Sequence, residues 1–434
     1  MSPPVDLVQS DTRLPAHADV VIIGGGIIGV STALFLAEKG HSVVLCEKGR
    51  IGGEQSSRNW GWCRTMGRDI GEVPLALESL KLWRTMNLRI NRETGYRQAG
   101  IMYLCENEKE VAGQEAWLEQ ARQYQVQSHL LRGEALDKIM PGAAGRFVGG
   151  LYTPTDGRAE PSQAAPAIAE AARALGATIL TECAVRGLDM EAGKVAGVVT
   201  EHGCIACGAV VLAGGAWSRL FCGNEGLDLP QLKVLGSVFR TAPISGGPEI
   251  TAAGSVFALR KRLDGGYSIA RRNANTATIT PDHFRLLSDF LPRLLSNRNE
   301  IRLRLGQRTW EELRTRRRWS LEDKTPFEAT RVLDPAPNKR ALGEARKLLS
   351  RAFPVFAGMQ VVESWAGLMD VTPDAVPVID QVGRIPGFYI ATGFSGHGFG
   401  IGPGAGQLMA DIVAGDRPIV DPAPYRLSRF RRAA

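Results

Sequence analysis

A short apolar run that meets a cluster of glycines constrains this chain more than any other feature of its sequence. Residues 20–23 are apolar without polar alternation, which is typical of a parallel strand buried on both faces. Residues 24–29 follow it in the pattern G-x-G-x-x-G. Residues 28–39 then carry apolar side chains at helical spacing, and residues 42–46 form a second buried strand. This order predicts a complete βαβ unit of the Rossmann type.

The glycines and one acidic residue give this unit the features of a dinucleotide site. Gly24 permits a tight turn, Gly26 lets the backbone approach a pyrophosphate, and Gly29 lets the helix pack closely on the sheet. The helix that starts at Ile28 offers unpaired N–H donors to the anion. Glu47 ends the next strand, about twenty residues on, where a carboxylate accepts hydrogen bonds from ribose hydroxyls. A glycine turn without a nucleotide is the alternative, and the whole context disfavours it.

Charge, cysteine content and the first residues argue against several other classes of protein. The net charge of +7 comes mainly from arginines between residues 285 and 318, so we expect no nucleic-acid partner. The seven cysteines are scattered, which suits a reducing compartment. Cys204 and Cys207 form a lone C-x-x-C, and a metal site would need a second pair, so no metal is expected. Neither a secretory signal nor a transmembrane helix is indicated, and we expect a cytoplasmic protein.

The rest of the chain alternates helical and extended patterns. RQAGIMYLC is predicted to contain a strand, strands dominate residues 234–269, and a helical, arginine-rich pattern covers residues 282–312. Further helices are predicted at 75–94, 108–124, 161–175 and 404–414, and further strands at 178–181, 194–200, 209–213 and 386–392.

The loop after Glu47, GRIGGEQSSRNWGWCRTMGRD, distinguishes FAD from other dinucleotides. It is too polar and glycine-rich to form a helix. The placement of residues 56–59 after Glu47 resembles the D-amino-acid oxidase superfamily of flavoproteins, in which this loop runs beside the isoalloxazine ring. Within it, SSRNWGWCR is similar to bacterial L-amino acid deaminases and their dehydrogenase relatives. The resemblance implies an FAD-dependent oxidoreductase.

Three further stretches extend the resemblance over most of the chain. Val185 lies where a strand of the family meets the adenine, and residues 210–218 resemble the strand and turn that approach the flavin, with Trp217 near its ring. The segment FYIATGFSGHGFGIGPGAGQLMADIVAG resembles a glycine loop and helix that place N–H donors near the flavin N1 and C2 carbonyl, where reduction puts negative charge. The resemblance assigns further cofactor contacts to Lys48, Ser56, Ser57, Arg58, Asn59, Ala213, Gly214, Gly393, Gly396, His397, Gly398, Phe399 and Gly400.

Together, pattern and resemblance predict an α/β fold. We expect a Rossmann-type FAD-binding domain with an inserted α+β substrate domain that consists of a mixed sheet plus helices. The discontinuous FAD-binding domain is expected at 18–80, 146–225 and 358–434. The substrate-binding domain is expected at 81–145 and 226–357, with a helical insertion near 282–350.

Monomeric sarcosine oxidase is similar in the segment FSGHGF but differs at informative positions. Its lysine that holds the substrate carboxylate is Gly400 here. Its cysteine that binds the flavin covalently matches Gly367, so we expect FAD to bind without a covalent link. Its lysine that supports oxygen reduction aligns near Ser268, which favours a dehydrogenase over an oxidase.

Another cation must then hold a substrate carboxylate, and a planar guanidinium is the usual solution. Arg260 lies in FALRKRLDGGYSIA, which resembles the part of L-amino acid deaminases that carries their carboxylate arginine, and it is the first candidate. Arg271 and Arg272 are weaker candidates, and a solvated surface position is the alternative for Arg260. By the same resemblance Trp365 and Met369 line the cavity beside the flavin, or else belong to the core.

The expected reaction is the oxidative deamination of an amino acid. The α-hydrogen would pass as hydride to the flavin N5, leaving an imino acid that water hydrolyses to an oxo acid and ammonia. No catalytic acid or base is required when the amine enters neutral, so His397 is expected to pack or hydrogen-bond near the cofactor. The alternatives are an oxidase of a secondary amine or N-methyl amino acid, and a flavin-bound subunit of a larger dehydrogenase complex.

The electron acceptor of such a dehydrogenase is expected to be a membrane quinone or a redox protein. The stretch LPRLLSNRNEIRLRLGQRTWEELRTRRRW stands where these deaminases carry an extra helical module that touches the membrane. A basic amphipathic helix binds an anionic bilayer surface, so peripheral contact with the inner face of a membrane is one expectation. A solvated face of the substrate domain is the other, and the N-terminal anchor of those deaminases is not seen in this sequence.

Overall fold

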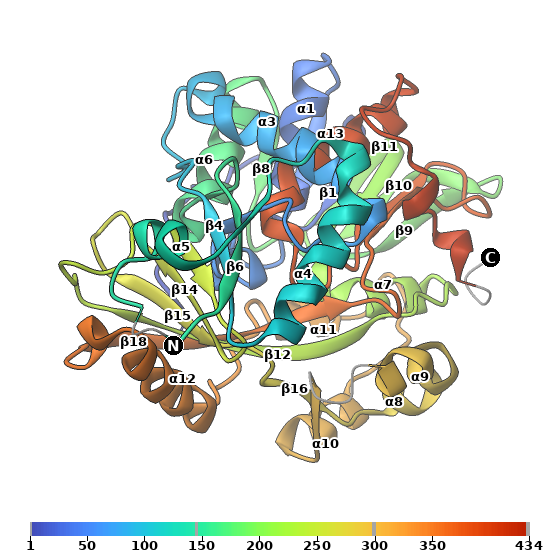
Figure 1. Cartoon of the computed structure of the whole chain (residues 1–434). Helices are drawn as coiled ribbons and strands as arrows, with labels where there is room; N and C mark the ends of the chain where they lie inside the picture. The colour runs from blue at the N-terminus through green and yellow to red at the C-terminus, as the bar shows by residue number, and fades with distance from the viewer. Residues whose placement is uncertain (1, 144–145, 297–300, 431–434) are drawn as a thin grey trace.

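A mostly parallel sheet contains the N-terminal βαβ unit. The computed structural model describes residues 2–143, 146–296 and 301–430 (Figure 1). The strand order is β19-β20-β11-β1-β2-β8, and β9 joins through β10 to β11. Strands β20, β11, β1, β2 and β8 run parallel, whereas β19, β10 and β9 pair antiparallel. The strands are β1 (His17–Ile23), β2 (Val43–Cys46), β8 (Thr178–Leu180), β9 (Val185–Glu191), β10 (Lys194–Thr200), β11 (Gly203–Leu212), β19 (Val378–Gln381) and β20 (Phe388–Thr392).

Successive side chains of the central strand β1 pack on opposite faces of this first sheet. Val20 and Ile22 belong to the core beneath a layer of helices, and Val21 belongs to the core against β9, β10 and α7 (Ser218–Asn224). Because both faces are covered, the strand sequence is apolar without alternation. Four helices gather on one side of the sheet in Figure 1: α1 (Ile27–Glu38), α3 (Val73–Ile90), α6 (Pro161–Ala174) and α13 (Gly398–Ala414).

Glycines allow α13 to lie directly against α1 and α3. A Cβ added at Gly406 would lie 2.7 Å from the backbone carbonyl carbon of Ser31, and one at Gly404 would lie 3.0 Å from the carbonyl oxygen of Leu75. Glycine has low helix propensity, so the sequence pattern predicts a helix only from residue 404. In the structure α13 begins at Gly398, because burial against two helices offsets the poor propensity of its first turns.

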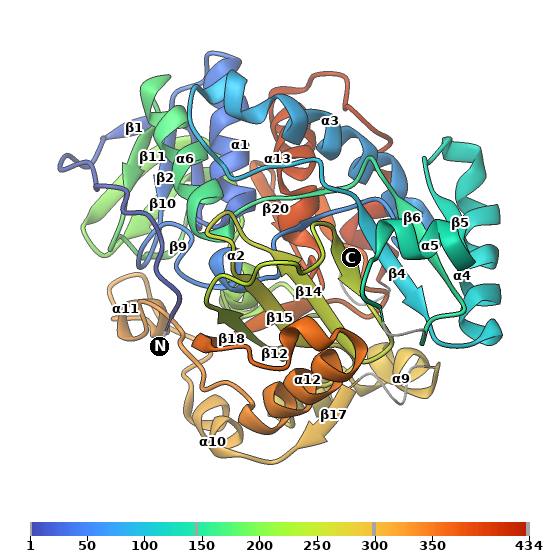
Figure 2. The same ribbon diagram turned by 60° about the vertical axis from the view of Figure 1, so that its left-hand side comes forward.

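The second sheet is mixed, with the strand order β17-β16-β12-β15-β14-β13-β4-β6-β5, and β18 pairs antiparallel with β12 along its length. Helix α12 packs on β12, β14 and β15, and Figure 2 shows it beneath these strands. The strands are β4 (Ile101–Cys105), β5 (His129–Leu131), β6 (Gly149–Thr153), β12 (Leu232–Thr241), β13 (Thr251–Ala253), β14 (Phe257–Lys261), β15 (Tyr267–Arg271), β16 (Asn275–Thr278), β17 (Ile301–Arg304) and β18 (Val361–Val371). The helices near this sheet are α4 (Glu108–Ala121), α5 (Gly133–Ile139) and α12 (Lys339–Ala352).

The expected fold class, a Rossmann-type α/β domain with an inserted α+β domain, is confirmed. The expected domain bounds stay a prediction, and three elements bear on them. β6 and β18, expected with the first sheet, pair in the second sheet. The part of α3 beyond residue 80, expected in the substrate domain, continues the helix that packs on α13. β18 is eleven residues long and was not among the strands predicted from the sequence, and its pairing with β12 shows which sheet it joins.

The arginine-rich insertion consists of short elements at one end of the second sheet. They are α8 (Pro281–Arg285), α9 (Leu287–Ser296), β17 and α10 (Gln307–Arg314), so a strand interrupts the expected helical pattern. Residues 297–300 of this expected helical stretch lie outside the described residues. No helix in the described part of the chain is long and apolar enough to cross a membrane.

Candidate active site

The carboxyl ends of β1, β2 and β11 border an elongated cavity at the N-terminus of α1, which we call the dinucleotide cavity. Gly24 has a φ of +112°, and a Cβ there would lie 2.5 Å from the carbonyl oxygen of Ala213. Gly26 is the N-cap residue of α1, so the backbone at the helix start is not covered by a side chain of its own. Ligands of open α/β sheets bind at this position, at the carboxyl ends of the strands.

Glu47 lies in this cavity with its carboxylate fixed by the backbone. Its two oxygens accept hydrogen bonds from the N–H groups of Gly25, at 2.7 Å, and Gly49, at 2.8 Å. Burial raises the pKa of Glu47, opposed by the charge of Lys48 and by these two donors. A carboxylate has about four acceptor positions, so each oxygen keeps capacity for a ribose hydroxyl.

The loop that was expected to be irregular contains one helical turn, α2 (Gln55–Arg58). Ser56 Oγ accepts a hydrogen bond from the Ile27 N–H at 2.8 Å, which fixes the loop to the start of α1. The buried Arg58 guanidinium donates to the carbonyl oxygens of Leu333, at 2.6 Å, and Ala366, at 3.0 Å. Arg58 therefore fastens the loop to β18 of the second sheet, and its polar sequence reflects these long-range bonds rather than solvent exposure.

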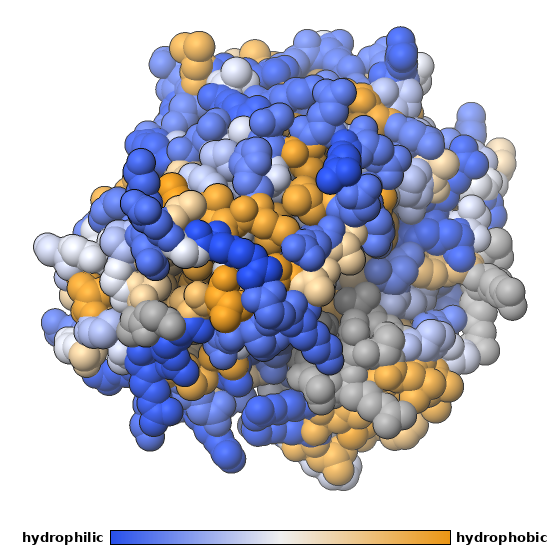
Figure 3. Space-filling model, in the orientation of Figure 1, coloured by the Kyte–Doolittle hydropathy of each residue, from blue (hydrophilic) through white to orange (hydrophobic). Residues whose placement is uncertain are grey.

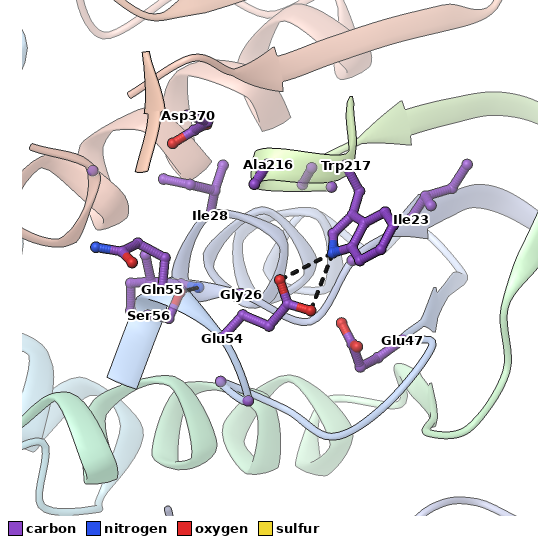
Figure 4. Close-up of a pocket in the computed structure, with 18 of the residues that line it drawn as sticks. Ile23, Gly26, Ile28, Glu47, Glu54, Gln55, Ser56, Ala216, Trp217 and Asp370 are labelled. Carbon is purple, nitrogen blue, oxygen red and sulfur yellow. Dashed lines mark hydrogen bonds between the residues drawn. The ribbon is translucent and has the colours of Figure 1, made fainter. Parts of the chain in front are cut away.

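A cluster that the sequence did not reveal lies at one wall of the dinucleotide cavity. Trp217 Nε1 donates to both carboxylate oxygens of Glu54, at 3.1 and 3.0 Å (Figure 4). The Lys48 ammonium lies 2.7 Å from Glu54 Oε1 and 4.5 Å from the centre of a Trp217 ring. Glu54 has no signal of its own in the sequence, because its role depends on Trp217, which lies in a distant turn of the chain.

The structure brings most of the expected cofactor residues to the dinucleotide cavity. The lining contains Gly24, Gly26, Ile28, Glu47, Lys48, Ser56, Asn59, Val185, Ala213, Gly214, Trp217, Gly396, Gly398 and Phe399. The other expected residues, Gly29, Ser57, Arg58, Gly393, His397 and Gly400, are not in its lining.

Two of these six residues, Arg58 and His397, line a second cavity that is described below. The other four contact residues of the backbone or loops around the dinucleotide cavity. Gly29 packs against the backbone of Gly24, and a Cβ at Gly400 would lie 2.6 Å from the carbonyl oxygen of Trp62. The Gly393 N–H donates to Asp370 Oδ2 at 2.8 Å. Ser57 Oγ donates to the carbonyl oxygen of Glu54.

A second, polar cavity of about 470 Å³ adjoins the first, and we call it the arginine cavity. Both linings contain Gln55, Asn59, Gly396 and Phe399, so the two spaces meet at these residues. Within the described chain Gln55 Oε1 is buried without a hydrogen-bond partner. A group with a polar edge that reaches this junction, such as an isoalloxazine ring whose dinucleotide occupies the first cavity, fits this orphaned acceptor and the glycines around it.

Arg260, which was expected to hold a substrate carboxylate, lies outside both of these cavities and lines a smaller one together with Trp365. Its side chain is 1% exposed and donates to both oxygens of Glu160, at 2.8 and 3.1 Å. Burial raises the pKa of Glu160, but the charge and hydrogen bonds of Arg260 outweigh it and leave that pKa below its usual value. A guanidinium that a buried carboxylate already neutralises is not available for a second one.

Trp365 and Met369, expected together beside the flavin, separate in the structure. Met369 lines the arginine cavity. Trp365 lies outside both cavities, is 2% exposed, and donates through Nε1 to the carbonyl oxygen of Arg58 at 3.1 Å. Trp365 therefore supports the loop that carries Gln55 and Ser56 and lines neither of these two cavities.

Arg272 and Arg64 lie on one aromatic ring in the arginine cavity. The guanidinium carbon of Arg272 lies 4.7 Å from the centre of the Tyr103 ring, and that of Arg64 lies 5.8 Å from it. Arg272 donates one hydrogen bond, to the carbonyl oxygen of Gly254 at 3.3 Å, and Arg64 donates to the carbonyl oxygen of Met66. Arg64 is a residue that the sequence analysis did not select.

A buried acidic residue lies beside this group near the start of α13. Glu72 is 1% exposed, and its Oε2 is 3.8 Å from His397 Nδ1. Burial raises the pKa of Glu72 to about 7, against the charges of Arg68 and Arg64. Arg68 donates through Nη2 to the carbonyl oxygen of His397 at 3.1 Å, so it holds the first turn of α13 at the junction of the two cavities.

The comparisons with known proteins agree with this geometry. The family model described as DAO, FAD dependent oxidoreductase, matches residues 19–412. The solved structure of L-amino acid deaminase from Proteus myxofaciens in complex with anthranilate superposes with a TM-score of 0.96 at 35% identity, and covers 99% of this chain and 97% of that one.

Two curated relatives are more distant. Glycine oxidase of Pseudomonas putida is 26% identical over 415 residues, which are 94% of this chain and 97% of that protein. Human mitochondrial sarcosine dehydrogenase is 25% identical over 436 residues, which are 98% of this chain but 43% of that protein. The chain thus spans less than half the length of that relative.

Proposed function

Because this chain belongs to the DAO family of FAD-dependent oxidoreductases, we propose that it oxidises the C–N bond of an amino acid, as a dehydrogenase or deaminase. One observation carries the proposal: the arginine cavity meets the dinucleotide cavity where the flavin end of FAD would lie, and it presents Arg272 and Arg64 over Tyr103. A guanidinium beside a flavin orients a carboxylate, which every amino acid carries.

The relatives support an amino acid substrate. The Proteus deaminase, glycine oxidase and sarcosine dehydrogenase are all named for amino acids, and anthranilate in the Proteus structure carries a carboxylate beside an amine. Sarcosine is an N-methyl amino acid, so an oxidation of secondary amines is the second candidate reaction.

When bound, FAD supplies a hydride acceptor for the substrate α-carbon. Arg272 takes the role first expected for Arg260 and holds the α-carboxylate, while Phe399 and Asn59 border the reacting end of the cavity. The N-terminus of α13 faces this junction, and its N–H groups favour negative charge there. The imino acid that leaves is hydrolysed by water to an oxo acid and ammonia.

Non-covalent binding of FAD is part of the proposal. Gly367, at the position that matches the flavin-linking cysteine of monomeric sarcosine oxidase, has no thiol to form a covalent link with the flavin. Denaturation in acid followed by filtration should release the yellow flavin into the filtrate, and flavin retained on the protein would contradict this point.

The acceptor is proposed to be a membrane quinone. Exposed apolar side chains gather on α8, α9, β17 and α10, and Figure 3 shows apolar residues along the lower edge where these elements lie. They are Phe284, Leu287, Leu291, Leu295, Leu303, Leu305, Trp310 and Leu313. Apolar side chains among arginines suit an anionic bilayer surface. We expect the protein to float with anionic vesicles and not with neutral vesicles. A protein that floats with neither kind of vesicle would favour a redox protein as acceptor.

Anaerobic reduction of the flavin tests the main proposal. The purified holoenzyme is mixed with L- and D-amino acids, N-methyl amino acids and simple amines, and the yellow absorbance is followed. Bleaching by amino acids with slow recovery in air is expected of a dehydrogenase. Rapid recovery with hydrogen peroxide would indicate an oxidase, and no bleaching by any compound would refute the proposal.

A further inference from the structure

The arginine cavity holds more positive charge than one α-carboxylate needs. Arg64, Arg68 and Arg272 all line it, and among the described residues none has a carboxylate within ion-pair distance. Other charged groups of the same lining are satisfied. Arg271 lies 3.7 Å from Glu344, and Asp374 lies 2.7 Å from an arginine outside the cavity, Arg429.

The cavity contains little negative charge to balance these three cations. Asp69 is exposed and accepts a hydrogen bond from the Gly71 N–H at 2.9 Å. The carboxylate of Glu72 is buried and accepts no hydrogen bond from any described residue, and its Oε2 lies 3.8 Å from His397 Nδ1. Burial raises the pKa of Glu72 to about 7, which reduces the charge that it contributes at neutral pH.

Arg68 shows the imbalance most clearly. It is 3% exposed, its Nε donates to the carbonyl oxygen of Arg64 at 3.3 Å, and its Nη2 donates to that of His397 at 3.1 Å. Its Nη1 is buried without a partner among the described residues. Burial and the nearby charge of Arg64 lower the pKa of Arg68 to about 10. A buried cationic donor without a partner is costly, and an anionic ligand would remove that cost.

The arrangement around Tyr103 also holds positive charge without a nearby counter-charge. Two guanidiniums, those of Arg64 and Arg272, lie against the one ring of Tyr103, and their like charges repel each other. Arg272 alone suffices for the α-carboxylate, because one guanidinium gives a carboxylate two parallel hydrogen bonds. A neutral aliphatic side chain placed in the remaining space would leave Arg64 and Arg68 without a counter-charge.

We propose that the substrate carries a second carboxylate, on the side chain of an acidic amino acid, which Arg64 and Arg68 bind while Arg272 holds the α-carboxylate. This inference rests on the proposed amino acid oxidation and narrows its substrate class. The chemical step is unchanged: two electrons and the α-hydrogen pass from the substrate to FAD, and the imine is hydrolysed.

Acid and amide pairs of equal shape test the inference on the unmodified holoenzyme. Aspartate is compared with asparagine, and glutamate with glutamine, in both enantiomers. The Kd of each substrate is obtained from the concentration dependence of anaerobic flavin reduction. Charge-assisted hydrogen bonds predict a Kd for the acid about 10- to 100-fold below that of its amide. If amides or aliphatic amino acids reduce the flavin with equal or lower Kd, this inference fails while the proposed function stands. If no amino acid reduces the flavin, the proposed function itself fails.

Two variants that remove the same charge test whether Arg64 causes the preference for the acid over its amide. Arg64→Gln should raise the Kd for the acid about tenfold and leave that for the amide within about twofold, because only the acid loses a charged partner. Arg84→Gln removes the same charge from the exposed surface of α3 and should change neither Kd. An Arg64→Gln enzyme that weakens acid and amide equally would overturn the assignment. Bound flavin content shows that both variants fold, and the comparison on the unmodified enzyme does not depend on them.

Discussion

Replacing Glu72 by glutamine should make the protein more resistant to rising pH. Burial raises the pKa of Glu72 from 4.5 to about 7. A carboxyl whose pKa is raised in the folded state favours the fold while it is protonated. That advantage is lost as the pH rises from about 4.5, where the unfolded chain loses the proton, through about 7, where the folded protein loses it. Glutamine cannot ionise, so the variant is not destabilised in this way as the pH rises.

The magnitude follows from the two pKa values. Each unit of separation corresponds to about 1.4 kcal/mol, so the cost of Glu72 is about 1.4 kcal/mol at pH 5.5 and about 3.4 kcal/mol at pH 8.5. The advantage of Glu72→Gln should therefore grow by about 2 kcal/mol between these pH values. For a chain of 434 residues this change corresponds to about 2 °C in Tm.

Thermal unfolding of the holoenzyme, followed by flavin fluorescence at pH 5.5 and 8.5, measures how much the stability advantage of Glu72→Gln increases with pH. Glu115→Gln makes the same substitution at an exposed position of α4 and should give the same small Tm difference at both pH values. A Tm difference between Glu72→Gln and the unmodified protein that is constant with pH, or that shrinks as the pH rises, would refute the reasoning.

Three further changes test other parts of the structure. Gly406→Val places a side chain against the backbone of Ser31 and should lower Tm by several degrees with loss of bound flavin, whereas an unchanged Tm would show that α1 and α13 can separate without cost. Arg260→Met leaves the buried Glu160 with only the more distant cation Arg262, at 3.9 Å, and should cost about 3 kcal/mol in urea unfolding, and adding Glu160→Gln to it should recover much of that loss. Glu47→Gln removes the charged acceptor for the ribose and should raise the Kd for FAD about tenfold in fluorescence titrations of the apoprotein, with a constant Kd counting against that role.

Local patterns predicted the first sheet and the dinucleotide cavity well. The βαβ unit is contiguous in sequence, and the roles of Gly24, Gly26 and Glu47 follow from neighbours within about twenty residues. Resemblance then brought distant segments such as Val185 and Gly396 to the same cavity, where the structure also has them.

Contacts between distant segments account for what sequence patterns missed. Arg260 and Arg272 are both arginines on the same strand-turn-strand segment, and only the buried partner of Arg260, Glu160, a hundred residues away, distinguishes them. Arg64 and Glu72 were overlooked because each is an ordinary charged residue outside any recognisable motif. Their significance comes from Tyr103 and His397, which the fold brings beside them.

The close packing of α1 and α13 also sets the order of events during protein synthesis. α13 is separated from α1 by most of the two sheets in the sequence, so the face that the two helices share stays uncovered until α13 emerges from the ribosome. At about 5–20 residues per second, that delay is roughly 20–70 s. For this interval the apolar face of α1 that α13 will cover is exposed to solvent and to chaperones.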